Sequence, residues 1–192
     1  MARLANIEVP EGLIASAREG LDDACARLYA AVAPATFGLI CRLIAGRAAA
    51  EDLFQETMMT VFERLGSFRG EAPLGAWVRQ IAVSKCLMYL RSPWHRARLD
   101  LATWDGESPL PELISRGESP GDILDVERAL ASLSPTARAV VWLFEVEGYS
   151  HQEIAQAFGR SASFSKSQLA RAHRRLRAWF EPQSARQPCT PA

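Results

Sequence analysis

Residues 50–65 read AEDLFQETMMTVFERL, and this stretch decides how the first half of the chain folds. An α-helix turns by about 100° per residue, so each side chain can be given a direction around the helix axis. Four side chains fall within roughly 60° of Asp52 on such a helix: Gln55, Glu56, Met59 and Glu63. Five apolar side chains gather near the opposite side: Phe54, Met58, Val61, Phe62 and Leu65. The stretch therefore predicts a helix with one core face and one acidic face, and the acidic face carries an exposed methionine.

The acidic face allows several interpretations. General acid–base catalysis needs carboxyl groups whose pKa values are pushed apart by burial, and this face lies opposite the core. A metal site needs further ligands from another helix, and the three histidines lie far away in sequence, at positions 95, 151 and 173. Docking onto a basic partner surface suits an acidic ridge with an amide and an apolar spot. Docking is favoured over an ordinary solvated face once the DNA-binding helix described below is considered.

Helical periodicity extends outward from this stretch over residues 11–91, and no segment alternates apolar and polar residues long enough to indicate a strand. Residues 92–125 differ, because four prolines, three glycines and a surplus of acids interrupt the pattern. Helical patterns resume near Val126. The fold class predicted is all-α, with two small helical domains joined by an acidic flexible linker.

The net charge is zero over 192 residues, but the charges are segregated. Residues 99–127 hold eight acidic side chains and one basic one, a net charge of −7, whereas residues 154–180 hold six basic side chains and no acid. Residues 42–98 carry a net charge of +4. This asymmetry is typical of two basic modules flanking an acidic connector. The predicted boundaries are 1–98, a linker at 99–127, 128–184, and a disordered tail at 185–192.

The sequence lacks motifs that indicate redox chemistry, metal binding or membrane insertion. Cys25, Cys41, Cys86 and Cys189 form no C-x-x-C pair, and the first three lie in apolar helical patterns, which favours reduced thiols that act as small hydrophobes. No cofactor is expected. The N-terminus lacks the basic start and apolar block of a leader, and Arg42 breaks the longest apolar run. We expect a cytoplasmic protein that is not inserted in a membrane.

The second domain carries clear helix signals. Ser134-Pro135 is a cap followed by proline at the first helical position, and Gly148 is a suitable stop. Ser150 and Glu153 form a capping box before a short helix that ends at Gly159. Ser161 can cap the next helix, which is expected to run to about Phe180. A short helix, a glycine turn and a longer basic helix predict a helix-turn-helix.

The long basic helix has two predicted faces. Leu169, Ala172, Leu176 and Phe180 recur at helical spacing and are expected to pack on the domain. Cations and small side chains occupy another face: Ser163, Lys166, Ser167, Ala170, Arg171 and Arg174. Arginine, lysine and serine reach base edges or phosphates in the major groove, so this face favours DNA binding over a merely solvated helix.

These motifs resemble a known family. The segment AEDLFQETMMTVFERLGSFRGEAPLGAWVRQIAVSKCLMYLR is similar to the second conserved region of bacterial sigma factors. The segment LASLSPTARAVVWLFEVEGYSHQEIAQAFGRSASFSKSQLARAHRRLR is similar to their fourth. The likeness covers roughly residues 24–91 and 128–178, and two such regions with a short linker resemble the extracytoplasmic-function (ECF) group. The resemblance implies a non-enzymatic factor that binds core RNA polymerase, recognises the −10 and −35 promoter elements and helps to open the DNA.

The resemblance also implies partners and residues. The acidic helix would dock on the clamp helices of the largest catalytic subunit through Asp52, Gln55, Glu56 and Met59. The −10 element would be bound as flipped-out single-stranded bases by the loop Ser67–Leu74 and the helix after it, with these residues as candidates: Ser67, Phe68, Arg69, Arg79, Ser84 and Lys85. The −35 duplex would be bound by the basic helix, with these candidates: Ser163, Phe164, Lys166, Ser167, Arg171 and Arg174. An anti-sigma factor is the expected regulator, and a stress response is the expected setting.

The chain departs from the family pattern in two places. Ser84 stands where an asparagine is frequent, and Ser163-Phe164-Ser165 stands where Gly-Thr-Val is favoured. Serine at a position that is usually apolar is expected to loosen the packing of the basic helix. Trp77 is expected to be a core residue more than a base-stacking one, because it continues the apolar spacing with Ile81.

Two other functions remain as alternatives. A stand-alone helix-turn-helix regulator would use the second domain alone, but it would not need the acidic ridge. An enzyme that uses the carboxylate cluster is the weaker alternative, because the cluster lies away from the core.

Overall fold

The computed structural model describes residues 4–92, 126 and 128–180. Among these residues all regular elements are helices, which confirms the all-α fold class. They fall into two compact units, and each unit is described by itself. The acidic linker, the proposed tail and the predicted boundaries at residues 98 and 184 lie outside the described residues. The domain boundaries therefore stay a prediction.

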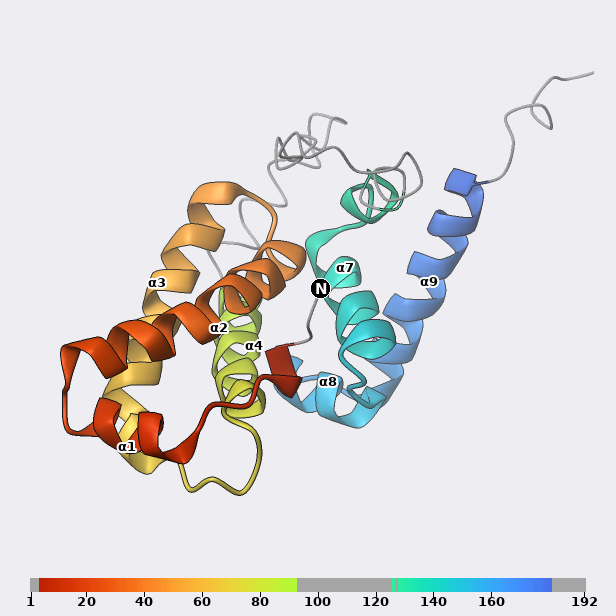
Figure 1. Ribbon diagram of the computed structural model, residues 1–192. Coiled ribbons are helices and arrows are strands. Elements are labelled where there is room, and N and C mark those ends of the chain that lie inside the picture. The colour runs from red at the N-terminus through yellow and green to blue at the C-terminus, as the bar shows by residue number, and fades with distance from the viewer. Residues whose placement is uncertain (1–3, 93–125, 127, 181–192) are drawn as a thin grey trace, which may run out of the picture. The chain divides into compact units, whose positions relative to one another are not determined.

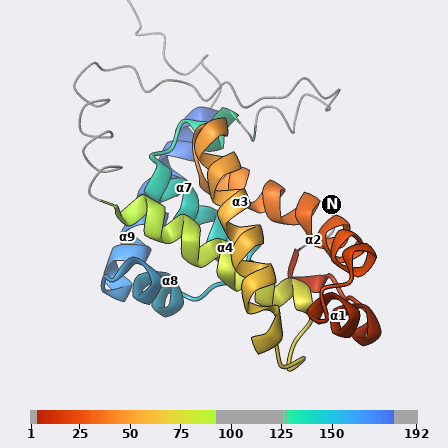
Figure 2. The same cartoon turned by 90° about the vertical axis from the view of Figure 1, so that its left-hand side faces the viewer.

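The first unit is a helical bundle that begins with a short 3₁₀ turn, η1 (Leu4–Asn6). Its longer elements are α1 (Glu11–Arg18), α2 (Asp22–Leu43), α3 (Arg47–Arg64) and α4 (Leu74–Arg91), with a 3₁₀ turn η2 (Leu65–Ser67) after α3. Helices α2, α3 and α4 pack against one another in pairs, and α1 packs on α2. Figure 1 shows this group around α2, and Figure 2 shows it turned by 90°.

Helix α2 is the centre of this bundle. Leu28, Val32 and Ile40 are completely buried on it. By length and composition alone the helix could also cross a membrane, with a mean hydropathy of 1.5. Its contacts with α1, α3 and α4 account for that apolar character, since a core helix needs the same residues.

Helix α3 has the two faces that its sequence predicts. Met58, Val61 and Leu65 are buried, while Phe54 and Phe62 are half-buried. The ring of Phe54 contacts the rings of Tyr29 and Phe37 on α2, at centroid distances of 6.2 and 5.4 Å. Leu53 and Thr57 are also buried, and the Thr57 hydroxyl donates to the Leu53 carbonyl at 2.6 Å. The core face is therefore wider than the helical angles alone indicated.

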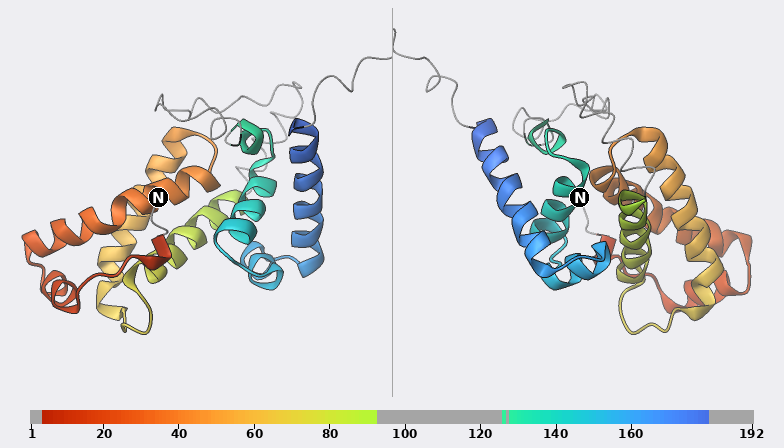
Figure 3. Two further views of the ribbon diagram at one scale, coloured as in Figure 1. Left: turned by 45° about the vertical axis from the view of Figure 1, so that its right-hand side comes forward. Right: turned by 180° about the vertical axis from the view of Figure 1, so that it is seen from behind.

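The second unit contains α7 (Pro135–Val141), a π-helical turn η3 (Trp142–Val146), α8 (His151–Phe158) and α9 (Ala162–Phe180). The Ser134 side chain accepts from the Ala137 amide, and Ser150 and Glu153 form the predicted capping box. Gly159 adopts a left-handed conformation with φ of 62° and ends α8. Helix α9 packs against α7 and α8, as Figure 3 shows from two sides, and the predicted helix-turn-helix is confirmed.

The end of α9 differs from the prediction. Leu169 and Ala172 are buried and Leu176 is half-buried, but Phe180 is 55% exposed and its neighbour Trp179 is 46% exposed. The expectation that Phe180 packs on the domain is therefore wrong within the described residues. Helical spacing gives the direction of a side chain, but it does not show where the neighbouring helices end.

The two adjacent methionines of α3 test its orientation. Met58 is 5% exposed and Met59 is 63% exposed. Replacing Met58 with alanine should lower the free energy of unfolding of the first unit by about 2–5 kcal/mol, the usual cost of a buried large-to-small change. Replacing Met59 with alanine should change it by less than about 0.5 kcal/mol. Hydrogen exchange of the most protected α3 amides measures both values, and equal losses would contradict the orientation.

Candidate functional site

The acidic face of α3 forms a continuous exposed surface. Asp52, Gln55, Glu56 and Met59, which we call the docking ridge, are all exposed, and so is Glu63 one turn further on. Burial of the opposite face holds these side chains outward. Exposed carboxylates beside a 63% exposed methionine can meet a partner that offers cations around an apolar spot.

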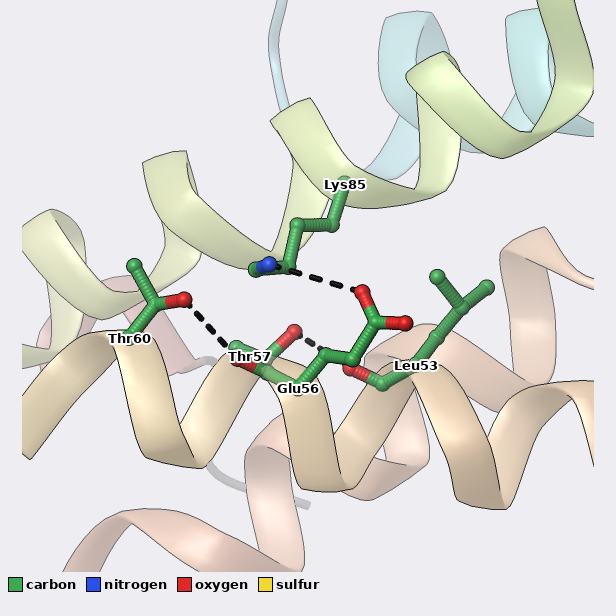
Figure 4. A network of polar contacts seen from close by, with 5 residues as sticks. All are labelled: Leu53, Glu56, Thr57, Thr60 and Lys85. Atoms are coloured by element: carbon green, nitrogen blue, oxygen red, sulfur yellow. Dashed lines mark hydrogen bonds and ion pairs between the residues drawn. The ribbon is translucent and has the colours of Figure 1, made fainter. Parts of the chain in front are cut away.

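One member of the docking ridge contacts the neighbouring helix. The Lys85 Nζ atom on α4 lies 3.5 Å from Glu56 Oε2 on α3. Figure 4 shows the lysine reaching across from α4 toward the Glu56 carboxylate, one turn from Thr60. The Lys85 side chain is 25% exposed and the Glu56 side chain 62%. A residue predicted for the polymerase and one predicted for the −10 element therefore contact each other, although 29 positions separate them.

Only some of the residues predicted to contact the −10 element are exposed in the loop Ser67–Leu74. Ser67 and Arg69 are exposed; the Ser67 hydroxyl donates to the Arg64 carbonyl at 2.7 Å, and Arg69 lies 3.9 Å from Glu71. Phe68 is only 9% exposed, and its ring lies 5.5 Å from that of Trp77. In this conformation Phe68 is an anchor beneath the loop and cannot stack on a base. Trp77 is half-buried, in line with its expected core role.

The remaining −10 candidates lie on α4. Ser84 is exposed and Arg79 is half-buried. Ser84 and Lys85 are adjacent on the helix, whereas Arg79 is more than one turn away from them. The structure thus brings Lys85 to the docking ridge, and it places Ser67 and Arg69 in the loop before the start of α4.

Helix α9 presents a basic surface of its own. All of the predicted polar members of its DNA-binding face are exposed: Ser163, Lys166, Ser167, Arg171 and Arg174. Phe164 is half-buried, and its ring lies 5.6 Å from that of Phe158 on α8. Phe164 therefore helps to pack the two helices of the helix-turn-helix together, whereas the other five candidates are exposed.

The departure at Ser165 has a structural explanation. Ser165 is completely buried, and its hydroxyl lies 3.0 Å from Nδ1 of His151 at the start of α8. The His151 ring also stacks on Phe144, with a centroid distance of 4.4 Å. A buried hydroxyl with a partner costs far less than an unpaired one. The serine thus has a polar contact that joins α8 to α9, and the expected loosening of the packing stays a prediction.

The described cysteines show no sign of a reactive site. Cys25, Cys41 and Cys86 are thiols that take part in no disulfide. Burial, reinforced by the neighbouring Cys41, raises the pKa of Cys86 to about 12, so this thiol stays protonated near neutral pH. Among the described residues, no group of three or more His, Cys, Asp or Glu side chains could hold a metal ion.

Sequence reasoning missed two features of this region. Arg18 of α1 donates from Nε to the Leu65 carbonyl at 3.1 Å and from Nη2 to the Phe68 carbonyl, at the start of the loop. An open cavity of about 530 Å³ lies beside the same loop, with Glu8, Glu11 and Arg18 among its lining residues. No local pattern signals these contacts, because they join positions about 50 residues apart.

Comparison with known proteins gives two family matches. The Sigma-70 region 2 family matches residues 28–96, and the family described as Sigma-70, region 4 matches residues 123–176. Together they cover more than half of the chain. The docking ridge and the loop Ser67–Leu74 lie in the first match, and α8 with most of α9 lies in the second.

Individual proteins give a similar result. The chain is 29% identical to the RNA polymerase sigma factor CarQ of Myxococcus xanthus over 161 residues, which cover 83% of this chain and 91% of CarQ. It is 32% identical to the ECF RNA polymerase sigma factor SigM of Mycobacterium tuberculosis over 128 residues, 66% of this chain and 62% of SigM. The alignment with SigM thus spans less than two thirds of that relative.

A solved structure extends the likeness to three dimensions. The co-crystal structure of the sigma factor RpoE in complex with the anti-sigma factor NepR from Bartonella quintana matches with a TM-score of 0.56 and 26% identity. The match covers 81% of this chain and 96% of the other chain.

Proposed function

The chain belongs to the sigma-70 family, and from this premise we propose that it is an alternative sigma factor of the ECF group. It would bind core RNA polymerase, direct it to promoters through the −10 and −35 elements and help to open the DNA. It is a transcription initiation factor and not an enzyme. The observation that carries the proposal is the exposed acidic ridge of α3 in the same chain as a helix-turn-helix with an exposed basic face.

The docking ridge is the proposed contact with polymerase. Asp52 and Gln55 are exposed, and Glu56 and Met59 continue the same face over the next turn. Their proposed target is a cationic surface on the clamp helices of the largest catalytic subunit. Charge complementarity of this kind favours fast association and suppresses wrong partners.

The two DNA elements are assigned to separate surfaces. Exposed Ser67, Arg69 and Ser84, together with Lys85 and Arg79, are the proposed contacts with the −10 element. Stacking and flipping are general means of holding bases that have left the duplex. The five exposed side chains of α9 are the proposed contacts with the −35 duplex, with Lys166 and Arg171 as the cations nearest the start of the helix. The burial of Phe68 and the packing of the half-buried Phe164 on Phe158 argue against direct DNA contacts by these two rings.

The proposed domain boundaries follow from the same assignment. Residues 1–98 would hold the polymerase and −10 functions, residues 99–127 would connect the domains, and residues 128–184 would bind the −35 element. Residues 185–192 would be a tail. The family matches at 28–96 and 123–176 support the first and third of these ranges.

Regulation and location are proposed from the relatives. The RpoE structure contains the anti-sigma factor NepR, and this chain shares its fold over 81% of its own length. An anti-sigma factor is therefore the proposed regulator, and the cytoplasm, where core polymerase and promoter DNA reside, is the proposed location. A stand-alone helix-turn-helix regulator is the alternative, and it would have no use for the docking ridge.

The combined change Asp52→Arg and Gln55→Ala tests the polymerase contact. It should lower the affinity for core polymerase by about 100-fold, because a cation would then face a cationic surface. Fluorescence anisotropy with labelled protein measures the affinity, and circular dichroism should show an unchanged helix content. Asp22→Arg, at an exposed carboxylate of α2, is the matched control and should leave the affinity intact. Unchanged binding and unchanged promoter output in the ridge variant would contradict the proposal.

The change Lys166→Ala with Arg171→Ala tests the −35 contact. Loss of a base contact should weaken binding to the promoter duplex by about 1–3 kcal/mol, and loss of a phosphate contact should lower the salt slope by about 1. Holoenzyme binding to duplex DNA at several salt concentrations separates the two effects. A duplex with a scrambled −35 element serves as the control. Equal affinity of wild type and variant for the intact duplex would exclude α9 as the reading helix.

A further inference from the structure

Residues 4–18 lie outside both family matches, yet they contact the loop Ser67–Leu74 near its two ends. Helix α1 packs on η2 at the start of the loop, and η1 packs on α4 at its end. We call residues 4–18 the N-terminal brace. The family match begins only at residue 28, so it assigns no role to this segment.

Arg18 holds the start of the loop. Its Nε donates to the carbonyl of Leu65 at 3.1 Å, and its Nη2 donates to the carbonyl of Phe68. Leu65 and Phe68 enclose Ser67, and Arg69 follows directly, so one guanidinium fixes the backbone on both sides of Ser67. A planar guanidinium has a rigid fork of donors, which suits it to bridging two acceptors.

A close backbone contact holds the end of the loop. The amide of Gly75, in the first turn of α4, donates to the carbonyl of Ile7 at 3.0 Å. A Cβ atom at position 75 would lie 1.9 Å from the carbonyl oxygen of Leu4 and 2.9 Å from the Cβ of Ile7. Glycine is therefore needed for this approach, and Leu4 is only 4% exposed there.

Between these two attachments the loop borders open space. The cavity of about 530 Å³ lies between the brace, which contributes Glu8, Glu11 and Arg18, and the loop, which contributes Arg69 and Glu71. The Phe68 ring anchors the loop by packing on Trp77. On the side of the loop that faces the brace, the cavity is not filled by side chains. Two local hydrogen bonds also shape the backbone here, from the Ser67 hydroxyl to the Arg64 carbonyl and from the Phe68 amide to the Leu65 carbonyl. The contacts of Arg18 are the ones that tie this backbone to the brace.

We propose that the N-terminal brace sets the shape in which the loop presents Ser67 and Arg69 to the −10 element, with Arg18 as the positioning residue. The proposal rests on the function proposed above. It adds a determinant of −10 sequence preference that lies outside residues 28–96, which match the Sigma-70 region 2 family. Arg18 acts through the carbonyls of Leu65 and Phe68 and does not itself contact DNA. The docking ridge lies on another part of α3, so affinity for polymerase does not depend on the brace.

The test uses full-length protein in complex with core polymerase. The probe is a fork-junction DNA library with a fixed −35 duplex and a randomised single-stranded −10 element, and the readout is the enrichment of the preferred −10 sequences over the rest. Arg18→Ala should lower that enrichment by roughly tenfold, because it removes both hydrogen bonds through which the brace holds the backbone around Ser67. Arg18→Lys should keep part of it, because a single amine can replace only part of the fork.

Two further variants separate positioning from folding. Arg27→Ala removes an exposed arginine of α2 that lies 3.8 Å from Asp23, and it should leave the enrichment unchanged. Gly75→Ala displaces the Leu4 carbonyl and should lower the enrichment in the same direction as Arg18→Ala. Affinity for core polymerase and for the −35 duplex should stay within about twofold of wild type in all variants.

The outcomes distinguish this inference from the function on which it rests. A wild-type holoenzyme that enriches −10 sequences, with Arg18→Ala enriching them equally well, would overturn the brace alone. A parallel loss of polymerase affinity in Arg18→Ala would also overturn it, because the segment would then act on the whole fold. A wild-type chain that neither binds core polymerase nor selects any sequence would overturn the proposed sigma function.

Discussion

The burial of one face of α3 is the constraint on which the first unit depends. Leu53, Thr57, Met58 and Val61 are all at most 7% exposed, and their packing against α2 and α4 fixes the rotation of α3 about its axis. That rotation turns Asp52, Gln55 and Met59 outward as a continuous ridge. It also brings Glu56 within reach of Lys85 on α4. A rotation by one residue would move every side chain by about 100° and would bury the carboxylates.

The second unit obtains its geometry from local signals and one buried polar contact. The capping box of Ser150 and Glu153 starts α8, and the left-handed Gly159 ends it, so the turn before α9 is fixed by the backbone. The contact between His151 and Ser165 then joins the start of α8 to α9. With its inner face packed on the domain, α9 leaves its basic side chains exposed, and these are the proposed contacts with duplex DNA.

The sequence predicted what depends on local periodicity and could not predict what depends on distant neighbours. The faces of α3, the capping box and the exposed face of α9 follow from helical spacing and residue type. The pairing of Glu56 with Lys85 and of Arg18 with the loop joins helices across 29 and about 50 positions, and it exists only after packing. Phe68 and Phe180 show that residue type alone does not predict whether a side chain is buried. Phe68 is 9% exposed beneath its loop and Phe180 is 55% exposed at the end of α9, although their residue type is the same.

The central claim is that one chain carries both a polymerase-docking surface and promoter-reading surfaces. In vitro transcription with purified core polymerase on a library of genomic fragments from the source organism tests it most directly. Addition of the protein should produce transcripts that start at a limited set of discrete positions, preceded by shared −10 and −35 sequences. If the protein adds no start site to those of core polymerase alone on any fragment, the account is contradicted.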